Sequence, residues 1–126
     1  MMERSEKLLP WQWKLYADNH AARRNLLLHV ASVPVFQLGT VCLVTAPFTS
    51  LAWALPGALA LVGAMAIQGR GHRLERVAPV PFRGPLDVLA RIFAEQWVTF
   101  PRFVLSGGFT RAWRAAGRAS EPQAGT

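Results

Sequence analysis

The feature that most constrains this chain is a stretch of 45 consecutive residues without a charged side chain, Asn25–Gly69. A transmembrane helix needs about 20 predominantly apolar residues to cross the hydrocarbon core of a bilayer. The stretch is about two such lengths, and the segment TAPFTS at 45–50 interrupts it near its middle with a proline and three hydroxyls. The sequence therefore predicts an all-α fold built on a membrane hairpin of two apolar spans within residues 26–68.

The alternative is a soluble helical bundle in which the same hairpin forms the buried core. A pair of helices that is apolar on every side leaves no face for water, which favours the membrane. Residues 1–24 mix acidic and basic side chains before the apolar stretch begins. We therefore expect no signal peptide.

The charged residues lie on both sides of the apolar stretch. Five of the 14 basic residues fall in residues 1–24 and nine in residues 70–118. The positive-inside rule then predicts that both termini face the cytoplasm, as for a protein of a bacterial inner membrane. The net charge of +7 suggests anionic lipid headgroups as a partner. Nucleic acid is not expected as a partner, because no aromatic and basic groove pattern or recognition helix is visible.

The rest of the chain predicts helices that flank the hairpin. A short amphipathic helix is expected at Trp11–Asn19, and a second begins around Pro85 and is kinked or ended by Pro101. Whether this second helix spans the membrane, lies in its interface or packs on the hairpin stays open, and a homo-oligomer is compatible with the pattern. Residues 1–108 are predicted to be one membrane-embedded domain. Residues 109–126 are predicted to be a basic, partly disordered tail.

The three histidines of the chain lie at the margins of the apolar stretch: His20, His29 and His72. A hairpin returns the chain to the side from which it left, so His29 and His72 are expected near the same membrane face. On one straight helix the nine residues from His20 to His29 would put their rings about 180° apart. The segment AARRN between them must therefore bend if all three are to share a site.

Polar residues accompany these histidines at helical spacing. Asn25 precedes His29 by four residues, Gln68 precedes His72 by four, and Glu75 follows His72 by three. Convergent imidazoles and a carboxylate suit a divalent transition metal such as iron, copper or zinc, and the two amides are placed to fix the imidazole tautomers. The alternative is that the histidines are interfacial and that Glu75 pairs with a neighbouring arginine or a headgroup.

Two blocks of the sequence together resemble a known family. The first block is Tyr-x3-His-x4-Asn-x3-His-x4-Pro over residues 16–34, and the second is Gln-x2-Gly-His over 68–72, followed by an acidic residue and a proline by residue 79. This pair of blocks resembles the small integral-membrane family typified by the fungal 2-hydroxy fatty acid dioxygenase of phytosphingosine breakdown. The similarity runs across most of residues 11–105, the hairpin included.

The resemblance implies an iron(II)-dependent enzyme that uses dioxygen to remove one carbon from a 2-hydroxy fatty acid. Carried over by position, the residues that it implies as ligands of Fe(2+) are His20, His29 and His72, with Glu75 as a further ligand or supporting group. The residues that it implies as supports for the ligands are Tyr16, Asn25 and Gln68.

The chain also departs from the family pattern. The acidic residue of the family usually follows its histidine by four residues, whereas Glu75 follows by three, and one residue rotates a helical side chain by about 100°. The segment EQWVTFPRFVLSGG at 95–108 has no counterpart in the fungal members. We therefore expect a bacterial-type branch of the family.

The substrate expected from this reading is a fatty acid or related lipid. Its acyl chain is expected along the hairpin, against Phe93, Trp97 and Phe100, and Arg70 or Arg73 is placed to bind its carboxylate unless these arginines contact headgroups instead. Two other functions remain open at this point. One is a non-catalytic membrane scaffold or assembly protein, and the other is a tether that binds anionic lipid or nucleic acid through the arginine-rich tail.

Overall fold

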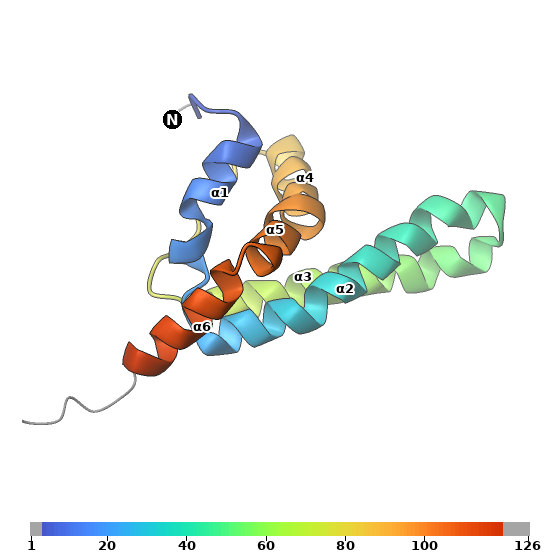
Figure 1. Cartoon of the computed structure of the whole chain (residues 1–126). Helices are drawn as coiled ribbons and strands as arrows, with labels where there is room; N and C mark the ends of the chain where they lie inside the picture. The colour runs from blue at the N-terminus through green and yellow to red at the C-terminus, as the bar shows by residue number, and fades with distance from the viewer. Residues whose placement is uncertain (1–3, 120–126) are drawn as a thin grey trace, which may run out of the picture.

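The computed structural model describes residues 4–119, and no strand occurs in that part of the chain, which confirms the predicted all-α class. Figure 1 shows how the elements follow one another. They are α1 (Leu8–Asn19), α2 (Arg23–Thr45), the 3-10 turns η1 (Ala46–Phe48) and η2 (Leu51–Trp53), α3 (Ala54–His72), α4 (Pro85–Ala94), the π-helical turn η3 (Glu95–Thr99), α5 (Phe100–Leu105) and α6 (Gly108–Ala119).

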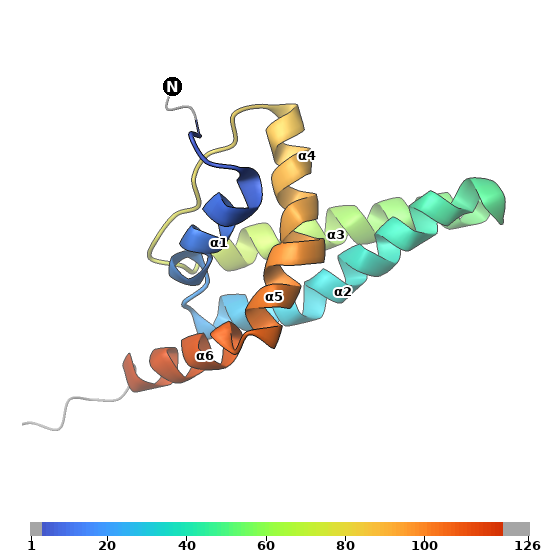
Figure 2. The same ribbon diagram turned by 45° about the horizontal axis from the view of Figure 1, so that its top comes forward.

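Helices α2 and α3 lie side by side as a long hairpin, with η1 and η2 at its tip (Figures 1 and 2). Glycines let the two backbones approach each other. A Cβ added at Gly57 would lie 2.9 Å from the carbonyl oxygen of Gly39, and one added at Gly39 would lie 2.8 Å from that of Gly57. Small residues at such a crossing allow close helix packing. This packing brings the two ends of the hairpin, at Arg23 and His72, to one place.

Both hairpin helices are long and apolar enough to cross a membrane. Their outer half stands clear of the other helices (Figure 1) and exposes its apolar side chains. Those more than 60% exposed include Leu38, Val44, Phe48, Leu51, Leu55, Leu59 and Val62. The other described helices therefore do not cover these apolar side chains.

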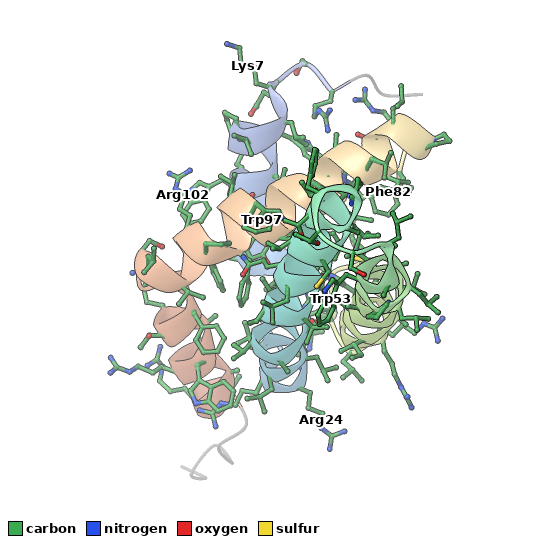
Figure 3. All side chains as sticks on the ribbon, turned by 90° about the vertical axis from the view of Figure 1, so that its right-hand side faces the viewer. Lys7, Arg24, Trp53, Phe82, Trp97 and Arg102 are labelled. Carbon is green, nitrogen blue, oxygen red and sulfur yellow. The ribbon has the colours of Figure 1, made fainter. Side chains whose placement is uncertain are left out.

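The remaining helices gather at the open end of the hairpin, which we call its base (Figures 1 and 2). The α4–η3–α5 segment crosses the hairpin there, and α1 packs beside it. A buried apolar core joins these elements, made of Tyr16, Leu26, Val33, Phe100 and Phe103. Seen along the hairpin from its tip, the labelled Lys7, Arg24 and Arg102 point outward around this base (Figure 3).

The helical segment that begins at Pro85 continues through Pro101 as α4, η3 and α5, so the expected stop is wrong. Proline lacks an N–H group and clashes with the preceding turn of an α-helix. Here the wider π-turn lies directly before it, and the N–H of Phe100 reaches back to the carbonyl of Glu95. The extra residue in that turn makes room for the proline ring, so the chain stays helical.

Part of the predicted basic tail is a packed helix. After Gly107, whose φ of 84° suits glycine, α6 runs back against α2 and α5. The Arg23 guanidinium lies 4.5 Å from the Trp113 ring centre and donates a 3.0 Å hydrogen bond to the Trp113 carbonyl. Residues 120–126 of the predicted tail lie outside the described residues.

Substitution of Gly57 tests the close approach of α2 and α3. Alanine in a helix is ordinarily more stable than glycine by about 0.5–1 kcal/mol. At Gly57 the added methyl group meets the Gly39 carbonyl, so we expect Gly57→Ala to lower the free energy of unfolding by about 1–3 kcal/mol. Thermal unfolding in mild detergent, followed by circular dichroism, measures this change.

Gly63→Ala is the matched control on the same helix, because a Cβ there meets nothing within 4 Å. We expect it to be neutral or stabilising. A Gly57→Ala protein as stable as the Gly63→Ala protein would contradict the close approach.

Candidate metal centre

The three histidines arrive at the base of the hairpin from separate segments. Helix α1 ends at Asn19, and His20 lies in the short link before α2 begins at Arg23. His29 follows in the second turn of α2, and His72 is the last residue of α3. The predicted bend between His20 and His29 is therefore present, formed by the break between the two helices.

The three imidazole rings lie together. Their centres are 4.6 Å apart for His20 and His29, 4.8 Å for His20 and His72, and 5.1 Å for His29 and His72. With Glu95 they form a group of four side chains whose ligand atoms all lie within 4.8 Å of one another. The structure therefore holds a compact set of metal-ligating groups.

Backbone carbonyls fix the orientation of two of the rings. The Nδ1 of His20 lies 2.8 Å from the Tyr16 carbonyl, and the Nδ1 of His29 lies 3.0 Å from the Asn25 carbonyl. A carbonyl only accepts, so each Nδ1 carries the proton and each Nε2 keeps its lone pair when the ring is neutral. The two Nε2 atoms face each other at 3.2 Å. Two lone pairs at that distance repel unless a cation lies between them.

His72 supplies the third ring. Its Nδ1 is buried and has no hydrogen-bond partner among the described residues. Burying such an atom without a partner costs free energy, and buried polar groups are almost always paired. An ion bound by the cluster would supply the partner that this nitrogen lacks.

Glu95 is the member of the cluster that sequence reasoning missed. Its Oε1 lies 3.3 Å from the Nε2 of His20 and 3.3 Å from the Nε2 of His29. Burial alone would raise the pKa of this carboxyl group, but when His20 and His29 are protonated their hydrogen bonds and charges outweigh burial and hold the pKa well below its ordinary value. The group is therefore a carboxylate. The signal in the sequence was a lone acidic residue within the apolar segment FAEQWVTF.

Tyr16 supports both Glu95 and His20. Its ring stacks on His20 with 3.8 Å between ring centres, and its hydroxyl donates to the Oε1 of Glu95 at 3.0 Å. Burial and the negative charge of Glu95 both raise the pKa of the phenol, so it remains protonated and continues to donate. The structure thus places Tyr16 in contact with two members of the cluster.

The structure places Glu75 outside the cluster. Its carboxylate accepts hydrogen bonds from the backbone N–H groups of Ala21 and Ala22 at 2.9–3.1 Å and from the Asn25 side chain at 2.8 Å. A carboxylate at a helix N-terminus meets unpaired N–H groups and the positive end of the helix dipole. Glu75 thus joins the end of α3 to the start of α2, and Glu95 contributes the carboxylate expected from Glu75.

The two amides expected to hold the rings have other partners. The backbone carbonyl of Asn25, not its side chain, accepts from His29. Gln68 pairs with Gln96 through two hydrogen bonds of 2.9 and 2.7 Å. Neither side-chain amide is therefore bonded to an imidazole.

A cavity of about 500 Å³ opens beside the cluster, and His20, His72 and Glu95 form part of its wall. Apolar side chains line most of the remainder, including Trp11, Leu15, Met65, Phe82 and Ile92. The side chains expected to contact an acyl chain, Phe93, Trp97 and Phe100, are not among its lining residues. The hydrophobic lining is instead contributed by α1, α3, α4 and the segment before α4.

Of the two arginines predicted to bind substrate, Arg73 lines this cavity, whereas Arg70 is exposed on α3 and is not among the lining residues. Arg91 lines the cavity as well. Its guanidinium lies 4.3 Å from the Phe82 ring centre, donates to the carbonyls of Val80 and Pro81, and lies 3.5 Å from the Asp87 carboxylate. Arg91 thereby fastens the segment before α4 over the cavity.

The cluster fits a divalent transition metal. Imidazole nitrogens and carboxylate oxygens bind such ions at about 2.0–2.2 Å, which puts neighbouring ligand atoms about 3.0 Å apart around an octahedral ion and about 3.4 Å apart around a tetrahedral one. The separations of 3.2–3.3 Å among His20, His29 and Glu95 lie between these two values. No protein-family model, curated protein or solved structure was found to match this chain. The chemistry of the donor set therefore rests on the residues themselves.

Substitution of the two glutamates separates a ligand from a structural support. We expect Glu95→Gln to weaken Co²⁺ binding by about 100-fold or more. Loss of a group that only supports a ligand typically weakens metal binding by about 10- to 100-fold. Glu75→Gln keeps a carbonyl oxygen for the N–H groups of Ala21 and Ala22 and is expected to weaken binding by less than about tenfold. Titration of the purified protein with Co²⁺, followed by visible absorption, measures both constants. A larger effect at Glu75 than at Glu95 would reverse the assignment.

Proposed function

We propose that this chain is a membrane-embedded, iron(II)-dependent oxygenase that shortens a 2-hydroxy fatty acid, or a related lipid, by one carbon. The observation that carries the proposal is the contact between the His–Glu cluster and an apolar cavity. His20, His72 and Glu95 belong to both. A fatty acid has the matching chemistry, because its reactive end is polar and binds metal while its chain is apolar.

The exposed hairpin supports the membrane location. Its outer half is free of charge and shows large apolar side chains on every side, a surface that lipid covers and water does not. The basic residues lie at the base, where the metal cluster is also found. The positive-inside rule then puts the base, both termini and the cavity on the cytoplasmic side.

The donor set supports iron in particular. Histidine and carboxylate ligands that leave coordination positions open are typical of oxygen-activating non-haem iron sites. Four protein ligands would leave two of the six positions of an octahedral ion open. The cavity borders three of the four side chains, His20, His72 and Glu95. When bound there, Fe(II) would supply the redox chemistry with dioxygen.

The residues of the chain supply binding and orientation. Arg73 and Arg91 both line the cavity, and their positive charge favours a substrate with an acidic end. Tyr16 keeps Glu95 in place by its hydrogen bond. The apolar lining excludes water around the acyl chain. For one turnover, a 2-hydroxy acid and one dioxygen would give the acid that is one carbon shorter, carbon dioxide and water.

Oxygen uptake tests this activity. Protein loaded with Fe(II) under anaerobic conditions in detergent is expected to consume dioxygen with 2-hydroxypalmitate and to form pentadecanoate, detected by mass spectrometry. Palmitate lacks the hydroxyl group needed for two-point binding and is expected to give no product. Zn²⁺-loaded protein is expected to be inactive because zinc has no redox chemistry.

Two variants complete this test. His29→Ala is expected to lose both iron and activity, whereas Arg70→Ala, at a residue that does not line the cavity, should keep both. An iron-loaded protein that is inactive with 2-hydroxy acids of several chain lengths would refute the proposed substrate and leave the metal centre in place.

Accessibility labelling tests the proposed orientation in the membrane. Ser50 lies exposed at the hairpin tip, and Ser106 lies exposed at the base. In a Cys42→Ser background, we expect a cysteine at 50 to react with an impermeant maleimide on intact bacterial cells and a cysteine at 106 to react only after the cells are opened. The reverse pattern would invert the orientation, and equal labelling of both positions in intact cells would argue against a spanning hairpin.

A further inference from the structure

Three glutamines meet where the α4–η3–α5 segment crosses the hairpin. Gln37 comes from α2, Gln68 from α3 and Gln96 from the π-turn η3. Gln68 and Gln96 are almost fully buried, at 1% and 0% exposure. Burying an amide in apolar surroundings is costly unless its hydrogen bonds are made. Two fully buried amides in a chain of this size therefore indicate a specific structural role.

The side chains of Gln68 and Gln96 form a closed pair. The Nε2 of Gln68 donates to the Oε1 of Gln96 at 2.9 Å, and the Nε2 of Gln96 donates to the Oε1 of Gln68 at 2.7 Å. Two antiparallel hydrogen bonds between planar amides allow only a narrow range of relative positions. The pair therefore sets how η3 lies against α3.

Gln37 satisfies a backbone group that the π-turn leaves without a donor. Continuing the π-helical spacing, the carbonyl of Gln96 would accept from residue 101, which is a proline and has no N–H. The N–H of Phe100 bonds to Glu95 instead. The Nε2 of Gln37 donates to the Gln96 carbonyl at 2.8 Å. One residue of η3 is thus held by both hairpin helices, through its side chain and through its backbone.

This attachment lies next to Glu95. On one side α4 is anchored by Arg91 to the segment before it, and on the other α5 is anchored by Phe100 and Phe103 in the core. The π-turn contains one residue more than an α-helical turn would need between these anchors, and one residue corresponds to a rotation of about 100°. Reverting to an α-helical turn would therefore turn Glu95 away from the imidazoles or pull an anchor out of place.

From these contacts we infer that Gln96 is a positioning residue, held by Gln68 and Gln37, that keeps the π-turn in the register in which Glu95 completes the metal centre. This inference rests on the metal centre of the proposed function. It assigns the three glutamines a task at the centre that needs no contact with the ion, although Gln68 also forms part of the cavity wall.

The double variant Gln68→Leu/Gln96→Leu tests this role. Replacing both members of a buried polar pair by apolar residues of similar size is often neutral or stabilising for the fold. We expect the thermal midpoint of unfolding to stay near the wild-type value. The affinity for Co²⁺ should nevertheless fall about 10- to 100-fold, and the visible spectrum of bound Co²⁺ should resemble that of Glu95→Gln.

Combination with Glu95→Gln sharpens the test. If the glutamine pair acts through Glu95, adding the double substitution to Glu95→Gln should cause no further loss of Co²⁺ affinity, because the effects of coupled residues are not additive. Thr40→Val is a matched control. It removes a hydroxyl that bonds only within α2, and it should leave affinity and spectrum unchanged.

The outcomes are distinct. A stable double variant with wild-type Co²⁺ affinity and spectrum would overturn the inference and leave the metal centre standing, whereas a wild-type protein that binds no Co²⁺ would overturn both. If the double variant does not fold, Gln37→Leu replaces it, because it leaves the buried pair intact and removes only the donor to the Gln96 carbonyl. A smaller loss of affinity with the same spectral change would support the inference, and an unchanged titration would refute it.

Discussion

Two imidazole nitrogens that face each other inside an apolar interior, with a carboxylate beside them, cost free energy unless the surrounding residues compensate them. Polar groups of this kind are stable in a core only when each is paired. The surroundings of the cluster provide these partners. The backbone carbonyls of Tyr16 and Asn25 accept hydrogen bonds from the Nδ1 atoms of His20 and His29, and the Tyr16 hydroxyl donates one to the Glu95 carboxylate. The orphaned nitrogen of His72 remains, and a bound cation would give it a partner.

The hairpin is what makes such a cluster possible in a short chain. Residues His29 and His72 are far apart in sequence and adjacent in space because the chain leaves the base of the hairpin and returns to it. The glycine contacts between α2 and α3 keep the helices close, and Glu75 joins their ends. Helices α1 and α4 close over this base and, together with α3 and the segment before α4, form the wall of the cavity.

The parts that could be predicted from sequence are those governed by charge and by helical periodicity. The absence of charge over residues 25–69 predicted two long apolar helices, and their return to one side predicted the meeting of the histidines. The carboxylate could not be predicted in this way. Glu95 reaches the cluster through a π-turn, which shifts the helical phase and leaves no mark in the spacing of apolar residues. Glu75, which is closer to His72 in the sequence, instead accepts hydrogen bonds from backbone N–H groups at the start of α2.

Long-range polar pairing was equally hidden. Gln68 lies on the same helical face as His72, so a bond between them was the natural expectation, yet its partner comes from the π-turn. Such pairs depend on which helices pack across each other, and the local sequence pattern does not predict this. The continuation of the helix through Pro101 has the same origin, because a neighbouring glutamine supplies the donor that proline lacks.

The four side chains of the cluster come from four different segments: the link after α1, then α2, the end of α3, and η3. An ion held by all four would act as a cross-link between these segments, in addition to the hydrogen bonds and packing that already join them. Its binding energy would then be shared with folding, so the folded population would rise with the free metal concentration. For the proposed enzyme, metal supply would set how much of the protein is folded as well as how much of it is active.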